Sequence, residues 1–447
     1  MTQIESPPET FLTARATWTS SASVRGCVAL AVGLSAASCS SPEENPIDST
    51  VVRDSAGVEI VLDVAQPLWP DGEGLRLSSR PALQIGTIEG EETALYDVVD
   101  ALRFEDGTIA VANSGSGEIK FFGATGEFLH SVGRPGDGPG EFQRLRKLHH
   151  RQADSLLLAF DYWAQRVTEY LSDGVLVRTV PLSSPASDAT GVSERGPRLL
   201  PIGWLHSGTL VTRREVRTRE PTSVGEGERL STSQGTVQLY LIDRDGRIAA
   251  LVDEVPGDER VARIGVLGRQ VSMSTVPVPF LKTFQGDAGA EVVVIGNTRT
   301  FDIRTYDAEG RLVRIIRRSS SPREVGADDR RGWIDGQLST VTDPTVRSRR
   351  RRQYEQMAFP TTLPTFESLV LGKNGLLWVE EFDPLVSPSD ESHWSVYDQQ
   401  GHRLGQVAMP PLFRPFEIGQ DYVLGVWKDD VGIEYVQLYD MTSGGTP

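Results

Sequence analysis

The sequence predicts an all-β chain folded as a six-bladed β-propeller of four-stranded antiparallel blades. The first observation is a run of four short apolar segments within residues 97–142, separated by glycine-containing turns, which is typical of a four-stranded meander. The second is that this arrangement recurs along the chain, because one meander cannot bury both of its faces without copies beside it. The third is that the last copy is one strand short, and a single strand near the N-terminus can complete it.

Composition and charge narrow the function classes. The chain has 447 residues, of which 38% are hydrophobic, and its 44 glycines and 27 prolines favour many turns over long helices. The net charge of −16 argues against nucleic acid as a partner, because phosphate binding needs a basic surface. The two cysteines, Cys27 and Cys39, lie near the start, which excludes a thiolate metal site or a cysteine nucleophile in the rest of the chain.

The N-terminal region is typical of an export signal. Residues 1–38 contain arginines followed by the apolar run CVALAVGLSAA, which is too short to span a membrane stably. Small residues then lead to Cys39, as in bacterial lipoprotein signals, so we expect lipid attachment at Cys39; a plain secretory signal cut near Ser38 is the alternative. Residues 39–55 are polar and contain proline, and we expect a flexible tether that carries the protein outside the cytoplasm, in the cell envelope.

The blades follow one another within residues 56–447. After the first meander, copies run over 142–182, 199–255, 278–318 and 366–409. The turns between their last two strands align at Gly126, Gly174, Gly246, Gly310 and Gly401. The third copy contains a polar insertion at 215–235. Residues 322–357 lack strand alternation, and we expect a helical insertion there between the fourth and fifth blades, divided by Pro344.

The ring is expected to close through strands from both ends of the chain. Residues 417–441 contain three strands, and the isolated strand at 82–86 occupies the position of a fourth. Joining them leaves no open sheet edge, which keeps a propeller from opening.

The segments FDYWAQRVTEYLSDG (160–174) and GRPGDGPGEF (133–142) carry a resemblance to NHL-type six-bladed β-propellers. In these repeats an acidic or amide residue closes the second strand, as Asn113, Asp161 and Asn297 do here. The C-terminal part resembles a subfamily of bacterial secreted propellers known by their fold alone. The resemblance covers about residues 80–441 and implies the architecture, but it implies no activity because this fold hosts enzymes, binders and scaffolds.

Chain direction indicates which face of the propeller carries the long loops and is therefore the candidate binding face. In a meander, the turns joining strands one to two and three to four share one face, and here these are tight glycine turns. The opposite, loop-rich face carries the long insertions, and loops on a rigid scaffold often carry function. The residues that close the second strands point to that face, so they are our candidate binding residues: Asn113, Asp161, Arg213, Asn297 and Glu380.

No catalytic residue, metal site or cofactor is predicted. The pair His149 and His150 would point to opposite faces of one strand, and SGSG in the first meander lacks the helix that a nucleophile elbow needs. The favoured function is a monomeric, non-catalytic, lipid-anchored propeller that binds a peptide, glycan or protein through the loop-rich face. The alternative is a lactonase-like hydrolase or lyase with a divalent metal in the central channel. The residues expected at the channel mouth, Asp100, Arg146, Lys282 and Arg414, are mostly basic, which favours an anionic ligand over a cation.

Overall fold

The structure is a computed structural model that describes residues 51–63, 66–70, 72–87, 90–183, 198–216, 229–267, 270–280, 284–318, 322–339, 341–383 and 390–444. Residues 48–447 form one compact unit. The expected leader at 1–38, the expected lipid attachment site Cys39 and the channel candidate Lys282 lie outside the described residues.

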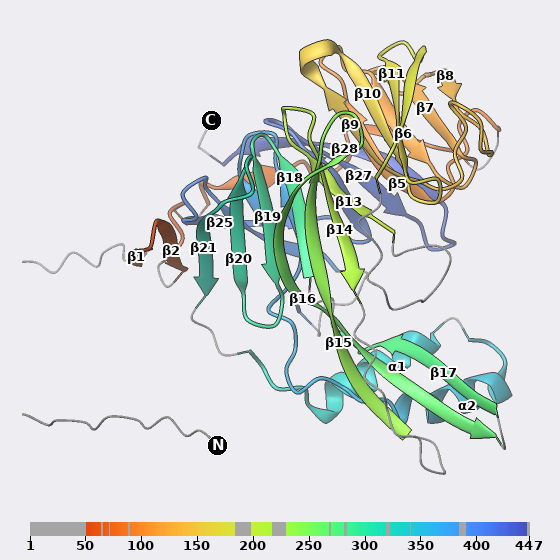
Figure 1. The fold of residues 1–447 in the computed structure, drawn as a ribbon, viewed down its shortest axis with the longest axis vertical. Coiled ribbons are helices and arrows are strands. Elements are labelled where there is room, and N and C mark those ends of the chain that lie inside the picture. Colours follow the sequence, from red (N-terminus) through yellow and green to blue (C-terminus); the bar gives the residue numbers. More distant parts are fainter. Residues whose placement is uncertain are drawn as a thin grey trace, which may run out of the picture. The chain divides into compact units, whose positions relative to one another are not determined.

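Six blades are present, each based on an antiparallel meander of consecutive strands, and the sixth is completed by strands from near the N-terminus (Figure 1). Blade 1 contains β5 (Val98–Arg103), β6 (Ile109–Asn113), β7 (Glu118–Phe122) and β8 (Phe128–Val132). Blade 2 contains β9 (Leu145–Arg151), β10 (Leu156–Asp161), β11 (Arg166–Leu171) and β12 (Leu176–Pro181), with the short 3-10 helix η1 (Gln152–Asp154) between its first two strands. Blade 3 contains β13 (Leu200–Trp204), β14 (Leu210–Val216), β15 (Arg229–Ile242), β16 (Ile248–Leu267) and β17 (Gln270–Pro277).

The remaining blades include strands from both ends of the described chain. Blade 4 contains β18 (Phe284–Gly289), β19 (Val292–Asn297), β20 (Asp302–Asp307) and β21 (Leu312–Arg318), and the N-terminal β1 (Val51–Ser55) and β2 (Val58–Asp63) extend its sheet. Blade 5 contains β22 (Phe366–Leu371), β23 (Leu377–Glu381), β24 (Ser392–Tyr397) and β25 (Arg403–Met409). Blade 6 contains β26 (Phe413–Ile418), β27 (Tyr422–Lys428), β28 (Glu434–Ser443), β3 (Leu75–Leu77) and β4 (Leu83–Ile85).

The six first strands surround a central channel. They contact one another in a closed cycle, in the order β5, β9, β13, β18, β22, β26 and back to β5. Closure occurs as the sequence predicts, because β4 pairs with β28 through Val436 opposite Ile85 and Leu438 opposite Leu83. β3 adds a second N-terminal contact to the same strand, with Leu77 opposite Met441.

Part of the expected tether is a strand. Residues 51–55, at the end of the segment predicted to be flexible, form β1, which pairs antiparallel with β2. β2 in turn pairs parallel with β21, the outer strand of blade 4. The apolar run GVEIVLDV at 57–64 predicts a short strand, which β2 confirms, but nothing in that run indicates β1 or the pairing with blade 4.

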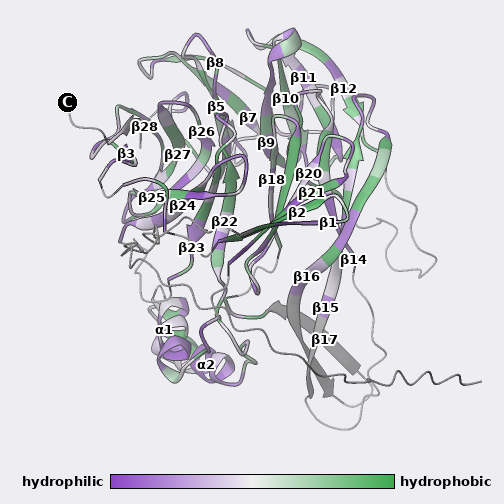
Figure 2. Cartoon of the chain, turned by 90° about the vertical axis from the view of Figure 1, so that its left-hand side faces the viewer, coloured by the Kyte–Doolittle hydropathy of each residue, from purple (hydrophilic) through white to green (hydrophobic). Residues whose placement is uncertain are grey.

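The insertions also differ in detail from expectation. The expected polar insertion at 215–235 is not a loop throughout, because its last residues belong to β15, which continues with β16 and β17 as a ribbon beyond the blade. The helical insertion at 322–357 contains α1 (Ala327–Leu338) and α2 (Pro344–Glu355), and Pro344 occupies the first turn of α2 as the sequence indicates (Figure 2). Neither described helix is long and apolar enough to cross a membrane.

The core consists of apolar clusters between neighbouring blades. Phe121, Phe142 and Leu157 join blades 1 and 2, and all three are at most 1% exposed. Trp378 and Trp394 join blade 5 to blade 6 and are equally buried. Each such side chain contributes about 1.5–3 kcal/mol by leaving water, so the repeated interfaces hold the ring together.

Candidate functional site

A cavity of about 430 Å³ lies in the channel, near the starts of the first strands. We call it the channel cavity. Its lining comes from the first strands of five blades and, in blade 5, also from β23 and β24: Val99, Asp100, Arg146, Lys147, Gly286, Asp287, Glu367, Ser368, Leu369, Val370, Glu380, Trp394, Phe413, Arg414, Pro415 and Phe416. The starts of first strands and the ends of second strands share one side of each blade, so the cavity opens on the loop-rich face.

β-Bulges turn side chains into this cavity. The pairing of five of the six first strands with their second strands shifts by one residue near the start. The extra residue is Val99 in blade 1, Arg146 in blade 2 and Phe416 in blade 6, and all three line the cavity. Bulges re-aim side chains and are frequent next to binding sites. A bulge is a register property, so it has no clear signal in the sequence.

Three cations converge in the channel cavity. Arg146 makes no hydrogen bond or ion pair with any described residue; its Nε is buried without a partner, and its guanidinium lies 5.8 Å from the Tyr162 ring centroid. Lys147 lies 3.8 Å from the Asp287 carboxylate, and Arg414 donates to the Val98 carbonyl at 3.0 Å. Burial lowers the pKa of Arg414 despite the opposing carboxylate of Asp100, and the nearby charge of Arg146 adds to the lowering. These three cations repel one another, and a bound anion would reduce that repulsion.

The two aspartates of the cavity connect neighbouring blades. Asp100 accepts hydrogen bonds from the backbone N–H groups of Ala101 at 3.0 Å and of Leu148, in blade 2, at 2.8 Å. Asp287 accepts in the same way from Ala288 and from Leu371 of blade 5, both at 2.9 Å. Their carboxylate oxygens are therefore used in holding the ring.

Burial also changes the charge of this cluster. It raises the pKa of Asp100 to about 6, so this carboxyl group offsets the cations less at mildly acidic pH than an ordinary aspartate would. Burial alone would lower the pKa of Lys147, but the carboxylates of Asp287 and Asp100 raise it, so Lys147 is charged at neutral pH.

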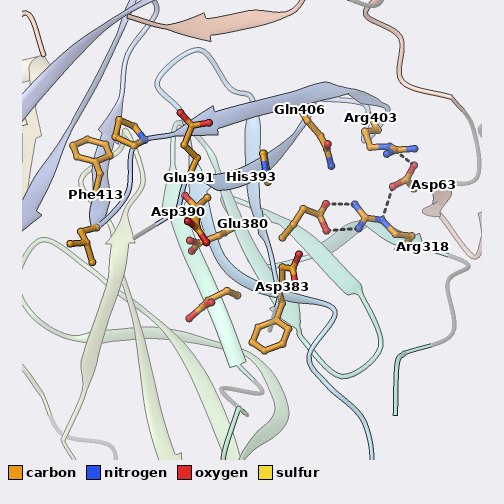
Figure 3. A pocket seen from close by; sticks show the side chains of 16 residues that line it. Asp63, Arg318, Glu380, Asp383, Asp390, Glu391, His393, Arg403, Gln406 and Phe413 are labelled. Atoms are coloured by element: carbon orange, nitrogen blue, oxygen red, sulfur yellow. Dashed lines mark hydrogen bonds and ion pairs between the residues drawn. The ribbon is translucent and has the colours of Figure 1, made fainter. Parts of the chain in front are cut away.

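A second cavity of about 650 Å³ adjoins the first, with Glu367, Glu380 and Phe413 lining both (Figure 3). We call it the side cavity. At one end lies an ion-pair network between blades 4 and 5, drawn at the right of Figure 3. There Arg318 donates to both oxygens of Glu381 at 2.8 Å and to Asp63 of β2 at 3.1 Å. This network ties the N-terminal strand to the ring.

The five candidate binding residues at the ends of the second strands lie in different surroundings. Asp161 is fully buried and accepts from four backbone N–H groups, those of Gln143 and Arg144 in the preceding connection and of Trp163 and Ala164 in its own loop, at 2.8–3.2 Å. Asn113 likewise joins the preceding connection to its own loop in blade 1, because it accepts from the Tyr96 N–H at 2.6 Å and donates to the Ser116 hydroxyl at 2.7 Å. Both side chains shape the loops of the face.

The other three candidate binding residues make different kinds of contact. Arg213 lies over the Phe284 ring, 5.0 Å from its centroid, and Asn297 accepts from the Arg299 N–H at 3.0 Å. Glu380 accepts from the Ser368 hydroxyl at 2.6 Å and lines both cavities, whereas the other four line neither. A second strand is one strand away from the channel, which explains why most of its end residues meet loops instead. Ligand binding through these five residues stays a prediction.

The residues expected at the channel mouth line a cavity more often than the candidate binding residues at the ends of the second strands. Asp100, Arg146 and Arg414, three of the four expected channel residues, line the channel cavity. Sequence reasoning did not single out Lys147 or Phe416. A lysine directly after Arg146 would point to the opposite side of a regular strand, and the bulge changes that relation.

The histidine pair belongs to the interfaces between blades. His149 stacks on Trp204 with ring centroids 5.4 Å apart, and His150 meets Phe104 edge-on at 4.7 Å. The two rings point to opposite sides of β9, as alternation predicts. Among the described residues, no group of three or more histidine, cysteine, aspartate and glutamate side chains is arranged to hold a metal ion.

Comparison with known proteins finds distant structural neighbours. The sequence matches no protein-family model and no curated protein. A putative exported protein from Bacteroides fragilis superimposes with a TM-score of 0.43 at 12% identity, over 86% of this chain and 99% of that one. A DUF4221 family member from Bacteroides vulgatus (TM-score 0.40, 10% identity, 83% and 99% coverage) and virginiamycin B lyase from Staphylococcus aureus (0.37, 9%, 82% and 99%) also match. Similarity this distant carries no information about ligand or activity.

Proposed function

We propose that this protein is a non-catalytic, lipid-anchored propeller of the cell envelope that binds an anionic group in the channel cavity. The ligand enters from the loop-rich face, and its carboxylate or phosphate meets Arg146, Lys147 and Arg414. A peptide carboxylate, an acidic glycan or an acidic segment of a partner protein would each present such a group. The leader at 1–38 and Cys39 support the location outside the cytoplasm.

Arg146 is the observation that carries this proposal. A guanidinium normally pairs with carboxylates or carbonyls, and leaving a buried polar atom without a partner costs about 1–3 kcal/mol. Here the bulge in β9 aims Arg146 into a cavity where no described residue satisfies it, beside two further cations. An anion would supply the missing acceptor in a bidentate arrangement.

The metal-dependent alternative requires a convergent set of ligands. A divalent cation needs several convergent oxygen or nitrogen ligands with negative charge. The channel cavity contains four carboxylates and three cations. Asp100 and Asp287 accept backbone N–H groups of neighbouring blades, Glu380 accepts from the Ser368 hydroxyl, and no group of three or more described acidic, histidine or cysteine side chains is arranged to hold a metal ion. This arrangement favours the anion-binding function over a lactonase-like hydrolase or lyase.

The test is isothermal titration of the protein with a panel of anions, chosen as short peptides with free or amidated carboxyl ends, uronic acids and sugar phosphates. We expect binding by members with a free carboxylate or phosphate and none by the amidated peptides. Arg146→Gln should weaken that binding at least about tenfold, or about 1.4 kcal/mol.

Arg144→Gln is the matched control. It removes the same charge two residues away, but Arg144 pairs with Asp97 at 3.2 Å and does not line the channel cavity. Its affinity should stay within about twofold of the unmodified protein, which is within ordinary measurement spread for a distant charge. Equal affinities for the unmodified protein and Arg146→Gln, or a panel in which nothing binds, would refute anion binding in the channel.

A further inference from the structure

The helix α2 is an exposed basic element in an acidic protein. It contains five arginines and one glutamate among its twelve residues, a net charge of +4 against −16 for the whole chain. Arg347, Arg349, Arg350 and Arg352 are exposed. Figure 2 shows the hydrophilic colour of this helix at the lower left. The channel function makes no use of this surface.

The arginines of α2 divide into two sets. Arg351 donates to Asp335 of α1 at 2.6 Å, and Tyr354 packs on Trp333 of α1 with ring centroids 5.3 Å apart, so this side of α2 faces its partner helix. Successive helical residues are about 100° apart, which places Arg349 and Arg352 on the opposite side. Arg350 lies on the flank between this side and the α1-facing side and is also exposed, and none of the three forms an ion pair with a described carboxylate.

The helices rest on the propeller through aromatic packing. Phe280, which follows blade 3, contacts Trp333 and Phe359 with ring centroids 6.4 Å and 6.1 Å apart. The same ring lies 6.1 Å from Phe382, at the end of blade 5. Backbone bonds fix the entry of the insertion as well, with Leu363 donating to the Arg323 carbonyl at 2.8 Å. The exposed arginines therefore stand on a supported platform of the loop-rich face.

The described chain starts at the end of blade 4 from which the chain continues toward α1. Val51 is opposite Leu62 in β2, and Leu62 is opposite Arg317 in β21, from whose end the chain continues toward α1 (Figure 1). Two strand spacings correspond to roughly 10 Å. The twelve residues 39–50 can span at most about 40 Å. An anchor at Cys39 would therefore hold this end of the propeller near the membrane.

We propose that the solvent-facing arginines of α2, Arg349, Arg350 and Arg352, contact an anionic phospholipid surface and turn the loop-rich face toward the membrane. The orientation rests on the anchoring at Cys39 proposed above, whereas the lipid contact itself does not. Lipid phosphates accept bidentate hydrogen bonds from guanidinium groups. At physiological salt the Debye length is about 8 Å, so the acidic charge elsewhere on the protein is screened and the local surface decides the contact.

The lipid contact can be measured without the anchor. Residues 40–447 contain every described helix and strand and no cysteine. We expect this part to co-sediment at low salt with phosphatidylcholine vesicles that contain phosphatidylglycerol, and not with phosphatidylcholine alone. The variant R349Q/R350Q/R352Q should reduce the partition coefficient at least about tenfold, because each basic residue near a charged membrane adds to the attraction.

A control of equal charge separates the local surface from the net charge. The variant R80Q/R247Q/R311Q removes three exposed arginines elsewhere on the propeller and should bind vesicles like the unmodified protein. Equal loss in both variants, or no binding to phosphatidylglycerol vesicles, would overturn the proposal. Tighter binding to duplex DNA or to an acidic protein than to vesicles would also overturn it, in favour of a polyanion partner.

The orientation has its own readout. A fluorophore on Ser348→Cys, within α2, should be quenched by lipids that carry a quencher in the headgroup, and one on Glu309→Cys, in the tight turn between β20 and β21, should not. Equal quenching at both positions would contradict a membrane-facing loop-rich face. None of these measurements requires the channel ligand, so failure here leaves the anion-binding proposal intact.

Discussion

Asp63 is the residue through which the N-terminal strand β2 is joined to blade 5. It is 7% exposed, and its carboxylate accepts from the Tyr397 hydroxyl at 2.8 Å and from Arg318 and Arg403 at 3.1 Å each. Removing one partner of a buried ion pair costs about 3–5 kcal/mol, because the remaining charges stay buried. Arg318 keeps both bonds to Glu381, which places Asp63→Ala near the lower limit, at about 3 kcal/mol.

The assay is urea denaturation of residues 40–447, followed by tryptophan fluorescence, with stability taken from the midpoint and slope. Asp54→Ala is the matched control, since Asp54 lies in the same hairpin but is exposed and accepts one bond, from the Gly57 N–H at 3.2 Å. It should change stability by less than about 0.5 kcal/mol. If Asp63→Ala is as stable as Asp54→Ala, the ion-pair network does not hold β2 to the ring.

Three further predictions concern single residues. Asp161→Ala should lower the unfolding free energy by about 3 kcal/mol in the same assay, because four backbone N–H groups lose a charged acceptor; a change below about 0.5 kcal/mol would contradict its role in holding the loops. Burial lowers the pKa of His149 to about 3, so the unfolded chain takes up the proton first as the pH falls through 6.5, and stability should drop by about 2 kcal/mol between pH 7 and pH 5. His149→Phe should lose that contribution, and an unchanged pH dependence would show that another group is responsible. Cys39→Ser should release the protein from membranes washed at high salt, where the α2 contact is screened, without changing its melting temperature; retention on washed membranes would remove the lipid anchor.

The architecture was predictable because it repeats. Turns such as Asp106–Gly107 and Asp173–Gly174 set the strand boundaries, and both glycines adopt the positive φ that such turns require, at +89° and +86°. Closure by residues 82–86 followed from counting strands in the last copy, and β4 confirms it. The face bearing the long connections followed from chain direction alone.

The site was less predictable, for two physical reasons. Residues that end second strands, such as Asn113 and Asp161, are recognisable because the repeat needs them to hold its loops, and that requirement resembles a functional one in a single sequence. The channel lining depends on bulges, which change which side of a strand a residue occupies, as with Arg146 and Lys147. The β1–β2 addition to blade 4 depends on a parallel contact more than 250 residues away in sequence, between Glu59 and Arg314, which local pattern cannot reveal.

The central claim is that the channel cavity holds an anion, and anomalous diffraction from crystals soaked in selenate tests it most directly. We expect a selenium peak within hydrogen-bonding distance of the Arg146 guanidinium, between Lys147 and Arg414, and its loss in Arg146→Gln crystals grown under the same conditions. A parallel soak in manganese should leave the channel without a peak. A manganese peak beside Asp100 and Asp287, with selenate absent from the cavity, would contradict the account.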